Sequence, residues 1–188
     1  MMLFPLKLSA QTDEQLMLRA ARGSDRAFEE LYNRHARRLQ GFFVRRLGDD
    51  ADLAADFMHD TFLRLYAARE KYHEGNSFRA WLYTIAYNLC KNHRRNQLAI
   101  VFGDSVAEEA AEADIEVELD TNILHDALCE VLKSLPEPYA MLFSLHYEEE
   151  LTIPQIAQIT DLPEGTVKSR LHKTMNIIKQ QMKQYENR

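Results

Sequence analysis

The stretch LTIPQIAQITDLPEGTVKSRLHK, residues 151–173, predicts two helices joined by a short turn. Its first half is apolar and its second half is basic, and Pro154 and Pro163 each stand where a helix would begin. Proline is tolerated in the first turn of a helix, because the amides there have no partner within the helix. Residues 160–162 separate the two patterns and form the expected turn.

The apolar residues of this pair are spaced so that the two helices can pack crossed. They are Ile156, Ala157 and Ile159 in the first helix and Val167, Leu171 and Ile178 in the second. The polar residues left facing outward are Ser169, His172, Lys173 and Asn176, with Lys168 and Arg170 on the flanks. This layout is typical of a helix-turn-helix, whose second helix reads the DNA major groove. Other helical pairs share the pattern, but the basic excess near the C-terminus favours DNA binding.

The rest of the chain also predicts helices. Its 188 residues include only 6 Gly and 5 Pro, which disfavours a many-stranded β fold with frequent turns. A first helix is capped by Thr12 or Asp13, and Ser77 is a good N-cap for a later one. Further helices are expected at 26–46, 51–69, 78–96, 123–134, 137–147, 153–159 and 163–185. The expected fold class is all-α, with two small helical domains.

The acidic residues are concentrated in one segment between these domains. The net charge is −6, yet residues 1–98 carry 16 Lys and Arg against 12 Asp and Glu. Residues 99–122 carry 8 acids and no base, and residues 123–188 carry 7 bases and 9 acids. A dense like-charged segment resists collapse, so 99–122 is expected to be a flexible linker. An exposed acidic helix is the alternative, given its Ala and Glu content.

Two helices are expected to carry functional residues on the side away from their apolar stripe. The helix near 51–69 places Asp56, His59, Asp60 and Leu63 opposite its core face. A solvated face explains the carboxylates, whereas an apolar residue with an acidic rim is typical of a protein interface. The helix from residue 78 presents Thr84, Asn88, Lys91 and Arg95 along one stripe, with Asn92 and Arg94 beside it.

These amide and basic groups suit bases and phosphates, and Tyr72 in the preceding loop offers a stacking surface. An ordinary basic surface is the alternative interpretation of this helix.

Several segments, taken together, resemble one known family. LPEGTVKSRLHK and SLPEPYAMLFSLHYEEELTIPQIAQIT resemble the C-terminal domain of extracytoplasmic-function (ECF) sigma factors of the sigma-70 family. AFEELYNRHARRL, DFMHDTFLRLYAAREKY and SFRAWLYTIAYNLCKNHRR resemble successive parts of the other domain. The likeness covers nearly everything outside residues 1–10 and the linker. It implies a region 2 domain over 8–98, the linker over 99–122 and a region 4 helix-turn-helix domain over 123–188.

The resemblance also implies a function and partners. Such a protein is a non-catalytic subunit that binds core RNA polymerase and directs promoter recognition, −10 melting and transcription initiation. The residues implied to bind the core polymerase are Asp56, His59, Asp60 and Leu63. Those implied at the −10 DNA are Tyr72, Asn88, Lys91, Asn92 and Arg95, with Asn88 at the position that captures a flipped base. Those implied at the −35 DNA are Lys168, Ser169, Arg170, His172 and Lys173.

The family's usual regulator is an anti-sigma factor, in some cases membrane-anchored. The linker would run through the polymerase near its active centre.

Some positions depart from the family pattern. His59 stands where Gln or Glu is usual, and Asp161 stands at a turn position often held by Gly. Asp tolerates left-handed geometry better than most residues, so the turn is expected to survive. Thr174 with Met175, and Ala140 with Met141, occupy positions that are often basic.

Two other functions would explain parts of the sequence. A dimeric operator-binding regulator explains the helix-turn-helix but leaves Leu63 and the acidic segment without a role. A zinc hydrolase is the second, since Cys90 with His93, and His125 with Cys129, have ligand-like spacings. These pairs lie in different domains. The sequence shows no nucleophile with a nearby base and no phosphate-loop motif, and no cofactor or metal is expected.

The two cysteines are expected to be free thiols. No signal peptide and no stretch of roughly 20 apolar residues is present, so a cytoplasmic protein without membrane insertion is expected.

Overall fold

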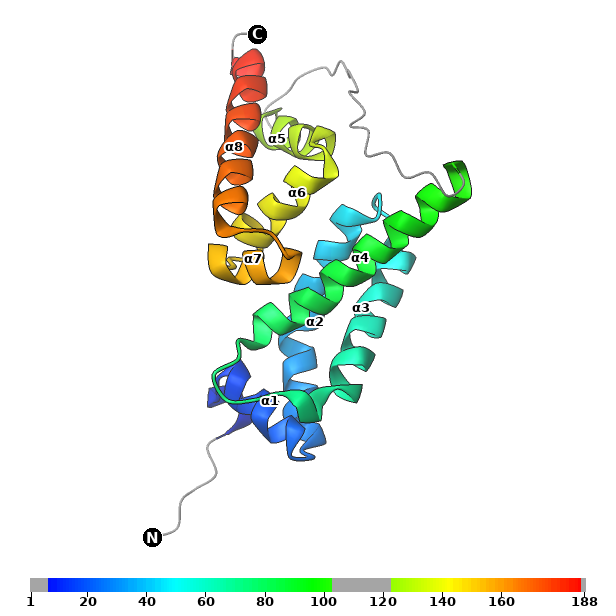
Figure 1. The fold of residues 1–188 in the computed structure, drawn as a ribbon, viewed down its shortest axis with the longest axis vertical. Helices are drawn as coiled ribbons and strands as arrows, with labels where there is room; N and C mark the ends of the chain where they lie inside the picture. The colour runs from blue at the N-terminus through cyan, green and yellow to red at the C-terminus, as the bar shows by residue number, and fades with distance from the viewer. Residues whose placement is uncertain (1–6, 103–122, 187–188) are drawn as a thin grey trace. The chain divides into compact units, whose positions relative to one another are not determined.

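A computed structural model describes residues 7–102 and 123–186, and within these ranges it contains eight α-helices and no β-strand (Figure 1). The chain divides into two compact units, Met1–Val101 and Phe102–Arg188. The all-α, two-domain prediction is therefore confirmed. Most of the predicted acidic linker, residues 103–122, lies outside the described residues, so its conformation and the expected domain limits stay predictions. No helix of the described part is long and apolar enough to cross a membrane.

The first unit contains α1 (Asp13–Ala21), α2 (Asp25–Arg46), α3 (Ala51–Ala67) and α4 (Phe78–Phe102). Three of these four helices have a side-chain cap at the N-terminus, whereas Ser24 before α2 makes no such hydrogen bond. Thr12 and Gln15 form a reciprocal capping box at α1, and Asp50 accepts the amide of Leu53 at α3. Ser77 Oγ accepts the amide of Ala80 at 3.3 Å at the start of α4. These caps satisfy amides that have no partner within their helices.

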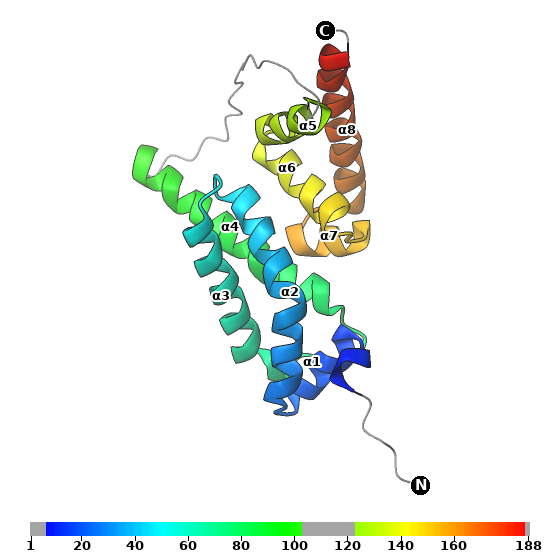
Figure 2. The same cartoon turned by 180° about the vertical axis from the view of Figure 1, so that it is seen from behind.

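Helix α2 is the centre of the first unit, and it lies alongside α3 in both views (Figures 1 and 2). It also packs against α1. Its Phe42 and Phe43 are fully buried, and Phe42 meets Tyr83 of α4 edge-on with ring centroids 5.4 Å apart. Of the seven residues whose spacing predicts the core stripe of α3, five are buried: Ala54, Met58, Thr61, Phe62 and Leu65. The other two, Phe57 and Tyr66, are partly exposed.

Helix α4 is longer than predicted, because it continues from the expected end at residue 96 to Phe102. The extension QLAIVF contains no helix breaker before Gly103.

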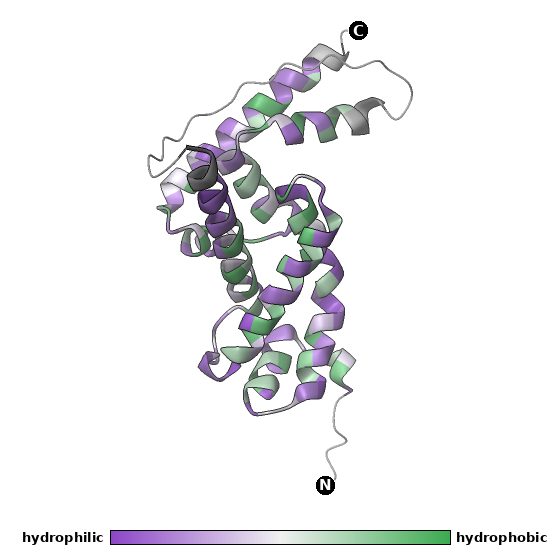
Figure 3. Ribbon diagram, turned by 90° about the vertical axis from the view of Figure 1, so that its right-hand side faces the viewer, coloured by the Kyte–Doolittle hydropathy of each residue, from purple (hydrophilic) through white to green (hydrophobic). Residues whose placement is uncertain are grey.

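The second unit contains α5 (Ile123–Ser134), α6 (Glu137–Phe143), α7 (Ile153–Thr160) and α8 (Glu164–Glu186). Helices α5, α6 and α7 each pack against α8. The single helix predicted over 137–147 is instead α6 followed by a π-helical turn, Ser144–Glu148, in which the Glu149 amide donates to the Ser144 carbonyl at 2.9 Å. The helices of both units carry hydrophilic and hydrophobic residues interspersed along their length, as is typical of amphipathic helices (Figure 3).

The helix-turn-helix forms as the sequence predicts. Thr152 and Gln155 make a capping box at α7, and Pro154 lies in its first turn. Asp161 ends α7 in the left-handed conformation, with φ 57° and ψ 36°. The residues predicted to hold the two helices together are largely buried: Ile156, Ile159, Val167, Leu171 and Ile178. The expectation that Asp161 preserves the turn is therefore confirmed.

Candidate nucleic-acid interface

The outer face of α3 presents an apolar residue among acids. Leu63 is 68% exposed, and with Tyr147 it is one of two exposed large hydrophobic residues in the described part of the chain. Asp56 and His59 are also exposed, and Asp60 is partly exposed. The four residues therefore share the solvent side of the helix, as their spacing predicted.

Two of these residues have partners within the unit. Asp60 Oδ1 accepts from Arg64 Nε at 2.9 Å, and the Asp60 hydrogen bond raises the pKa of Arg64. The His59 ring stacks on Tyr32, whose hydroxyl lies 3.2 Å from His59 Nε2. An exposed i,i+4 ion pair contributes only about 0–1 kcal/mol, so another partner can compete for Asp60. The Tyr32 contact gives His59 a fixed ring orientation.

Helix α4 presents polar side chains along one face. Asn88, Lys91, Asn92 and Arg95 are exposed, whereas their neighbours Leu89 and Cys90 are buried. The helix is held by fully buried residues on its opposite side, among them Phe78, Leu82 and Ala86. Thr84, the first member of the predicted stripe, is only partly exposed, and its hydroxyl donates to the Ala80 carbonyl at 2.7 Å. The stripe therefore begins at Asn88.

The prediction that Tyr72 offers a free stacking surface is wrong for this conformation. The side chain is only 4% exposed, and its ring stacks on Trp81 with centroids 5.5 Å apart. Its hydroxyl donates a short hydrogen bond to the Asn76 carbonyl and so closes the loop between the two residues. Burial, with smaller contributions from Glu14 and Asp13, raises the pKa of Tyr72 to about 12. A local loop pattern cannot reveal this burial, because Trp81 lies on the next helix.

Within that loop, the residues at the tip are the exposed ones. His73, Glu74, Gly75 and Asn76 all face solvent, and the Asn76 amide donates to the His73 carbonyl at 3.2 Å. Gly75 has φ +92°, a conformation that favours glycine. The side chains at the tip therefore belong to a turn whose conformation is held by the buried side chain of Tyr72.

Helix α8 presents the predicted basic surface of the helix-turn-helix. Lys168, Ser169, His172 and Lys173 are exposed, and Arg170 is partly exposed. Internal contacts orient several of them. Lys168 pairs loosely with Glu164 at 3.7 Å, Lys173 Nζ lies 5.3 Å from the ring centre of Tyr139, and Asn176 Nδ2 lies 3.3 Å from His172 Nδ1.

Of the four positions that are often basic in the family, three are buried here and Met175 is partly buried. Thr174 is fully buried and donates to the Arg170 carbonyl at 2.8 Å, and Ala140 and Met141 are each about 5% exposed. Small or apolar residues at these positions pack in the core, so they do not extend the surface of α8. In the N-terminal half of α8 the basic residues are thus Lys168, Arg170 and Lys173, and Lys179 and Lys183 are exposed further along the helix.

The described residues give no support for a zinc site. Among the side chains that the structure describes, within 7–97 and 127–183, no three His, Cys, Asp or Glu lie close enough together to hold a metal ion. Cys90 is buried and Cys129 is partly buried, and both are free of disulfide bonds.

One contact that sequence reasoning missed joins α1 to α4. Glu14 Oε1 lies 3.4 Å from the amide of Phe78, although 64 residues separate them. Glu14 lies in the first turn of α1, where an acid is ordinarily explained by the helix dipole alone. No sequence signal distinguishes the two roles.

Two family models match the chain in the order of its two units. Sigma-70 region 2 matches residues 31–99, and Sigma-70 region 4 matches residues 125–176. The chain is 30% identical over 151 residues to RNA polymerase sigma factor CarQ of Myxococcus xanthus, covering 80% of this chain and 86% of that protein. It is 29% identical over 178 residues to an ECF RNA polymerase sigma-E factor of Haemophilus influenzae, covering 89% and 93%.

Two solved structures share the fold of this chain. CnrH, solved in complex with the cytosolic domain of CnrY, has a TM-score of 0.64 at 22% identity, over 89% of this chain and 94% of that one. The sigma factor RpoE of Bartonella quintana, solved with the anti-sigma factor NepR, has a TM-score of 0.65 at 20% identity, over 83% and 96%. With both family models matched and its fold shared, this chain belongs to the ECF RNA polymerase sigma factors of the sigma-70 family.

Proposed function

We propose that this sigma factor acts as a non-catalytic initiation subunit, in which three separate surfaces bind core polymerase, the −10 element and the −35 element. The observation that carries the proposal is that α3, α4 and α8 each present the predicted polar face to solvent while their opposite sides are buried. A purely structural set of helices would not need an exposed Leu63 or a cluster of exposed amides and bases.

The α3 face is proposed to bind core polymerase. Leu63 would enter an apolar site on the polymerase, and Asp56 and Asp60 would meet basic residues around it. Interfaces of this kind concentrate their binding energy in a desolvated apolar centre with a polar rim. His59 would take part through the orientation that Tyr32 gives its ring.

The α4 face is proposed to bind the −10 element. Asn88 carries both a donor and an acceptor, so its amide can pair with the edge of an extruded base. Lys91 and Arg95 would contact phosphates on either side, with Asn92 beside them. Tyr72 would act indirectly, because its buried side chain holds the conformation of the loop. Bases displaced during melting would be captured without any hydrolysis step.

The second unit is proposed to bind duplex −35 DNA through α8. Lys168, Ser169 and Arg170 lie in the N-terminal half of the helix, which is the part of a recognition helix that reaches base edges. His172 and Lys173 extend the contact by half a turn. Losing a single phosphate contact should weaken binding on all sequences and reduce its salt dependence.

An anti-sigma factor is proposed as the regulator, because the structural neighbours CnrH and RpoE were solved with CnrY and the anti-sigma factor NepR. Such a regulator would cover surfaces that the polymerase needs. We further propose a cytoplasmic location and domain limits of 8–98, 99–122 and 123–188, with the acidic segment joining the two units.

The test of the −10 assignment is a promoter library randomised at the −10 element and selected by transcription. Asn88→Ala should change the preferred base at one position, at a cost of about 1–3 kcal/mol for the lost base contact. Binding to core polymerase and to duplex −35 DNA should stay as in the wild type. An identical base preference in wild type and variant would remove Asn88 from the proposal.

A further inference from the structure

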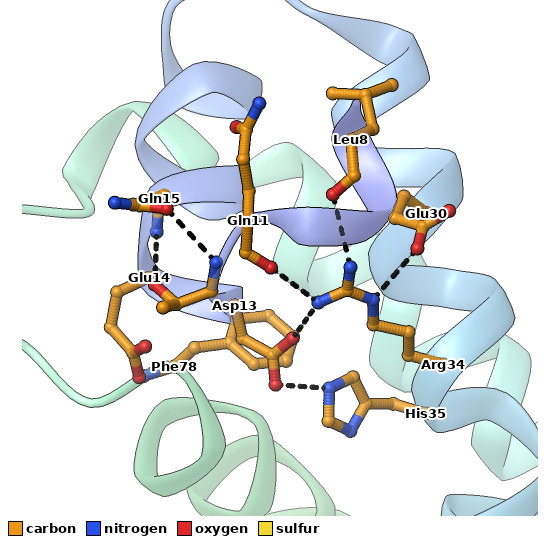
Figure 4. Close-up of polar contacts among 10 residues, drawn as sticks. Leu8, Gln11, Asp13, Glu14, Gln15, Glu30, Arg34, His35 and Phe78 are labelled. Atoms are coloured by element: carbon orange, nitrogen blue, oxygen red, sulfur yellow. Dashed lines mark hydrogen bonds and ion pairs between the residues drawn. The ribbon is translucent and has the colours of Figure 1, made fainter. Parts of the chain in front are cut away.

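Two neighbouring acids of α1 are linked to Phe78, the first residue of α4: Glu14 directly and Asp13 through His35 (Figure 4). Glu14 Oε1 accepts from the amide of Phe78 at 3.4 Å. Asp13 Oδ2 lies 2.7 Å from His35 Nε2, and the His35 ring lies against the Phe78 ring with centroids 5.1 Å apart. Phe78 is fully buried, so the start of α4 is held through both its backbone and its side chain.

Arg34 of α2 fixes the position of Asp13 and of the chain before α1. Its guanidinium donates to the carbonyls of Leu8 and Gln11 at 3.2 and 2.9 Å, to Asp13 at 3.0 Å and to Glu30 at 2.9 Å (Figure 4). A planar guanidinium offers five donors in a rigid fork, so it can hold several acceptors in one geometry. The chain before α1 and the first turn of α1 are therefore tied to α2.

The charge of Glu14 suits its position at the N-terminus of α4. The first amides of a helix have no partner within it, and the helix dipole favours a negative charge there. Glu14 accepts from the backbone amide of Phe78, and Ser77 accepts from the backbone amide of Ala80, so each side chain caps a different amide of α4. One of the two caps comes from a helix far away in the sequence.

The same acids lie near the other end of the loop that precedes α4. Glu14 and Asp13 both contribute to raising the pKa of Tyr72, the residue that begins the loop. Tyr72 closes the loop on the Asn76 carbonyl, and α1 packs against the helical turn Arg69–Lys71 just before it. Both ends of the loop, at Tyr72 and at Phe78, thus lie beside α1.

We infer that Glu14, held in place by the Asp13–Arg34 network, is a positioning residue for −10 recognition: it fixes the start of α4 and the loop before it. This inference rests on the proposed role of α4 at the −10 element. Glu14 itself touches no DNA in this scheme. Loss of the contact between Glu14 and the Phe78 amide should slow promoter opening, because the captured bases would then have to order the loop as they bind.

The experiment compares Glu14→Ala, which removes the acceptor, with Glu14→Gln, which keeps an oxygen at the same place. Glu29→Ala is the control, because Glu29 is an exposed acid on the neighbouring helix and its loss changes the net charge equally. The full-length protein is assayed with core polymerase for the rate of open-complex formation. In parallel, hydrogen exchange of the Phe78 amide is measured by NMR in the free protein.

Glu14→Ala should raise exchange at Phe78 and lower the opening rate by about threefold to tenfold, the size expected for one lost hydrogen bond. Glu14→Gln should recover most of the rate, and Glu29→Ala should match the wild type. Affinity for core polymerase and for duplex −35 DNA should stay constant in all three.

Two results would overturn the inference. Unchanged exchange at Phe78 in Glu14→Ala would show that the contact does not hold α4. Raised exchange with a normal opening rate would show that the contact is structural only. Asn88→Ala distinguishes this failure from failure of the proposed function: if Asn88→Ala slows opening and Glu14→Ala does not, only the positioning role is lost.

Discussion

Leu63 is 68% exposed on α3. It lies among acidic residues, which water solvates well, whereas an apolar side chain gains nothing from this exposure. Leu63→Asp should therefore weaken binding to core polymerase by about 2 kcal/mol or more, roughly thirtyfold in Kd, because it puts a charge at the centre of the proposed interface. Fold should be unaffected, since the residue is on the surface. The measurement is polymerase binding by fluorescence anisotropy, with circular dichroism as the check on folding.

Ala51→Asp is the matched control for that change. It adds the same charge to an exposed position on α3, at the helix N-terminus, where an acid is tolerated. Equal polymerase affinity in Leu63→Asp and Ala51→Asp would count against the α3 interface.

Tyr72 gives a prediction about alkaline stability. Its pKa is raised from 10.0 to about 12 in the folded protein, so between those values the unfolded chain loses its proton while the folded one keeps it. The stabilisation is complete below pH 10 and is lost as the pH rises toward 12. Urea unfolding of wild type and Tyr72→Phe should therefore show a shallower alkaline loss in the variant. Parallel curves for the two proteins above pH 10 would refute the prediction.

At the scale of the element, the turn between α7 and α8 depends on a backbone conformation that few residues adopt. Asp161 has φ 57°, and a β-branched residue there carries a larger steric penalty than Asp, whereas Gly carries none. Asp161→Val should lower the free energy of unfolding by about 1–2 kcal/mol, and Asp161→Gly should leave it equal or slightly higher. Thermal unfolding of the full chain checks this order, and equal midpoints for Val and Gly would contradict it.

Helix starts and buried faces could be predicted because they depend on short-range pattern, whereas the ends of α4 and α6 were predicted wrongly. The stripe through Ala54, Met58 and Phe62, and the pair Ile156 and Val167, follow from helical spacing alone. Caps at Thr12 and Ser77 follow from local side-chain chemistry.

What the sequence could not predict depends on tertiary contacts. Tyr72 lies in a polar loop, yet its ring is buried against Trp81. Glu14 looks like a first-turn acid, yet it contacts Phe78, 64 residues away. In both cases the partner belongs to another helix, so residue type and spacing within one segment carry no information about it.

At the scale of the whole molecule, the two units present different chemistry to promoter DNA. The first carries amides and bases on α4 beside a loop held from inside, which suits single-stranded bases. The second carries exposed basic residues on α8, the helix proposed to bind the −35 element, and this surface suits duplex DNA. Joining both in one polymerase-bound chain would allow each weak contact to raise the effective concentration of the other.

The most direct test of the central claim is runoff transcription with purified core RNA polymerase, this chain and a library of promoter templates. A sigma factor should give discrete transcripts from a subset of templates, which require both the chain and intact −10 and −35 elements. Leu63→Asp and Asn88→Ala should each reduce them, the first by loss of polymerase binding and the second by loss of opening. Folded chain that binds core polymerase poorly and yields no template-specific transcript would contradict the claim.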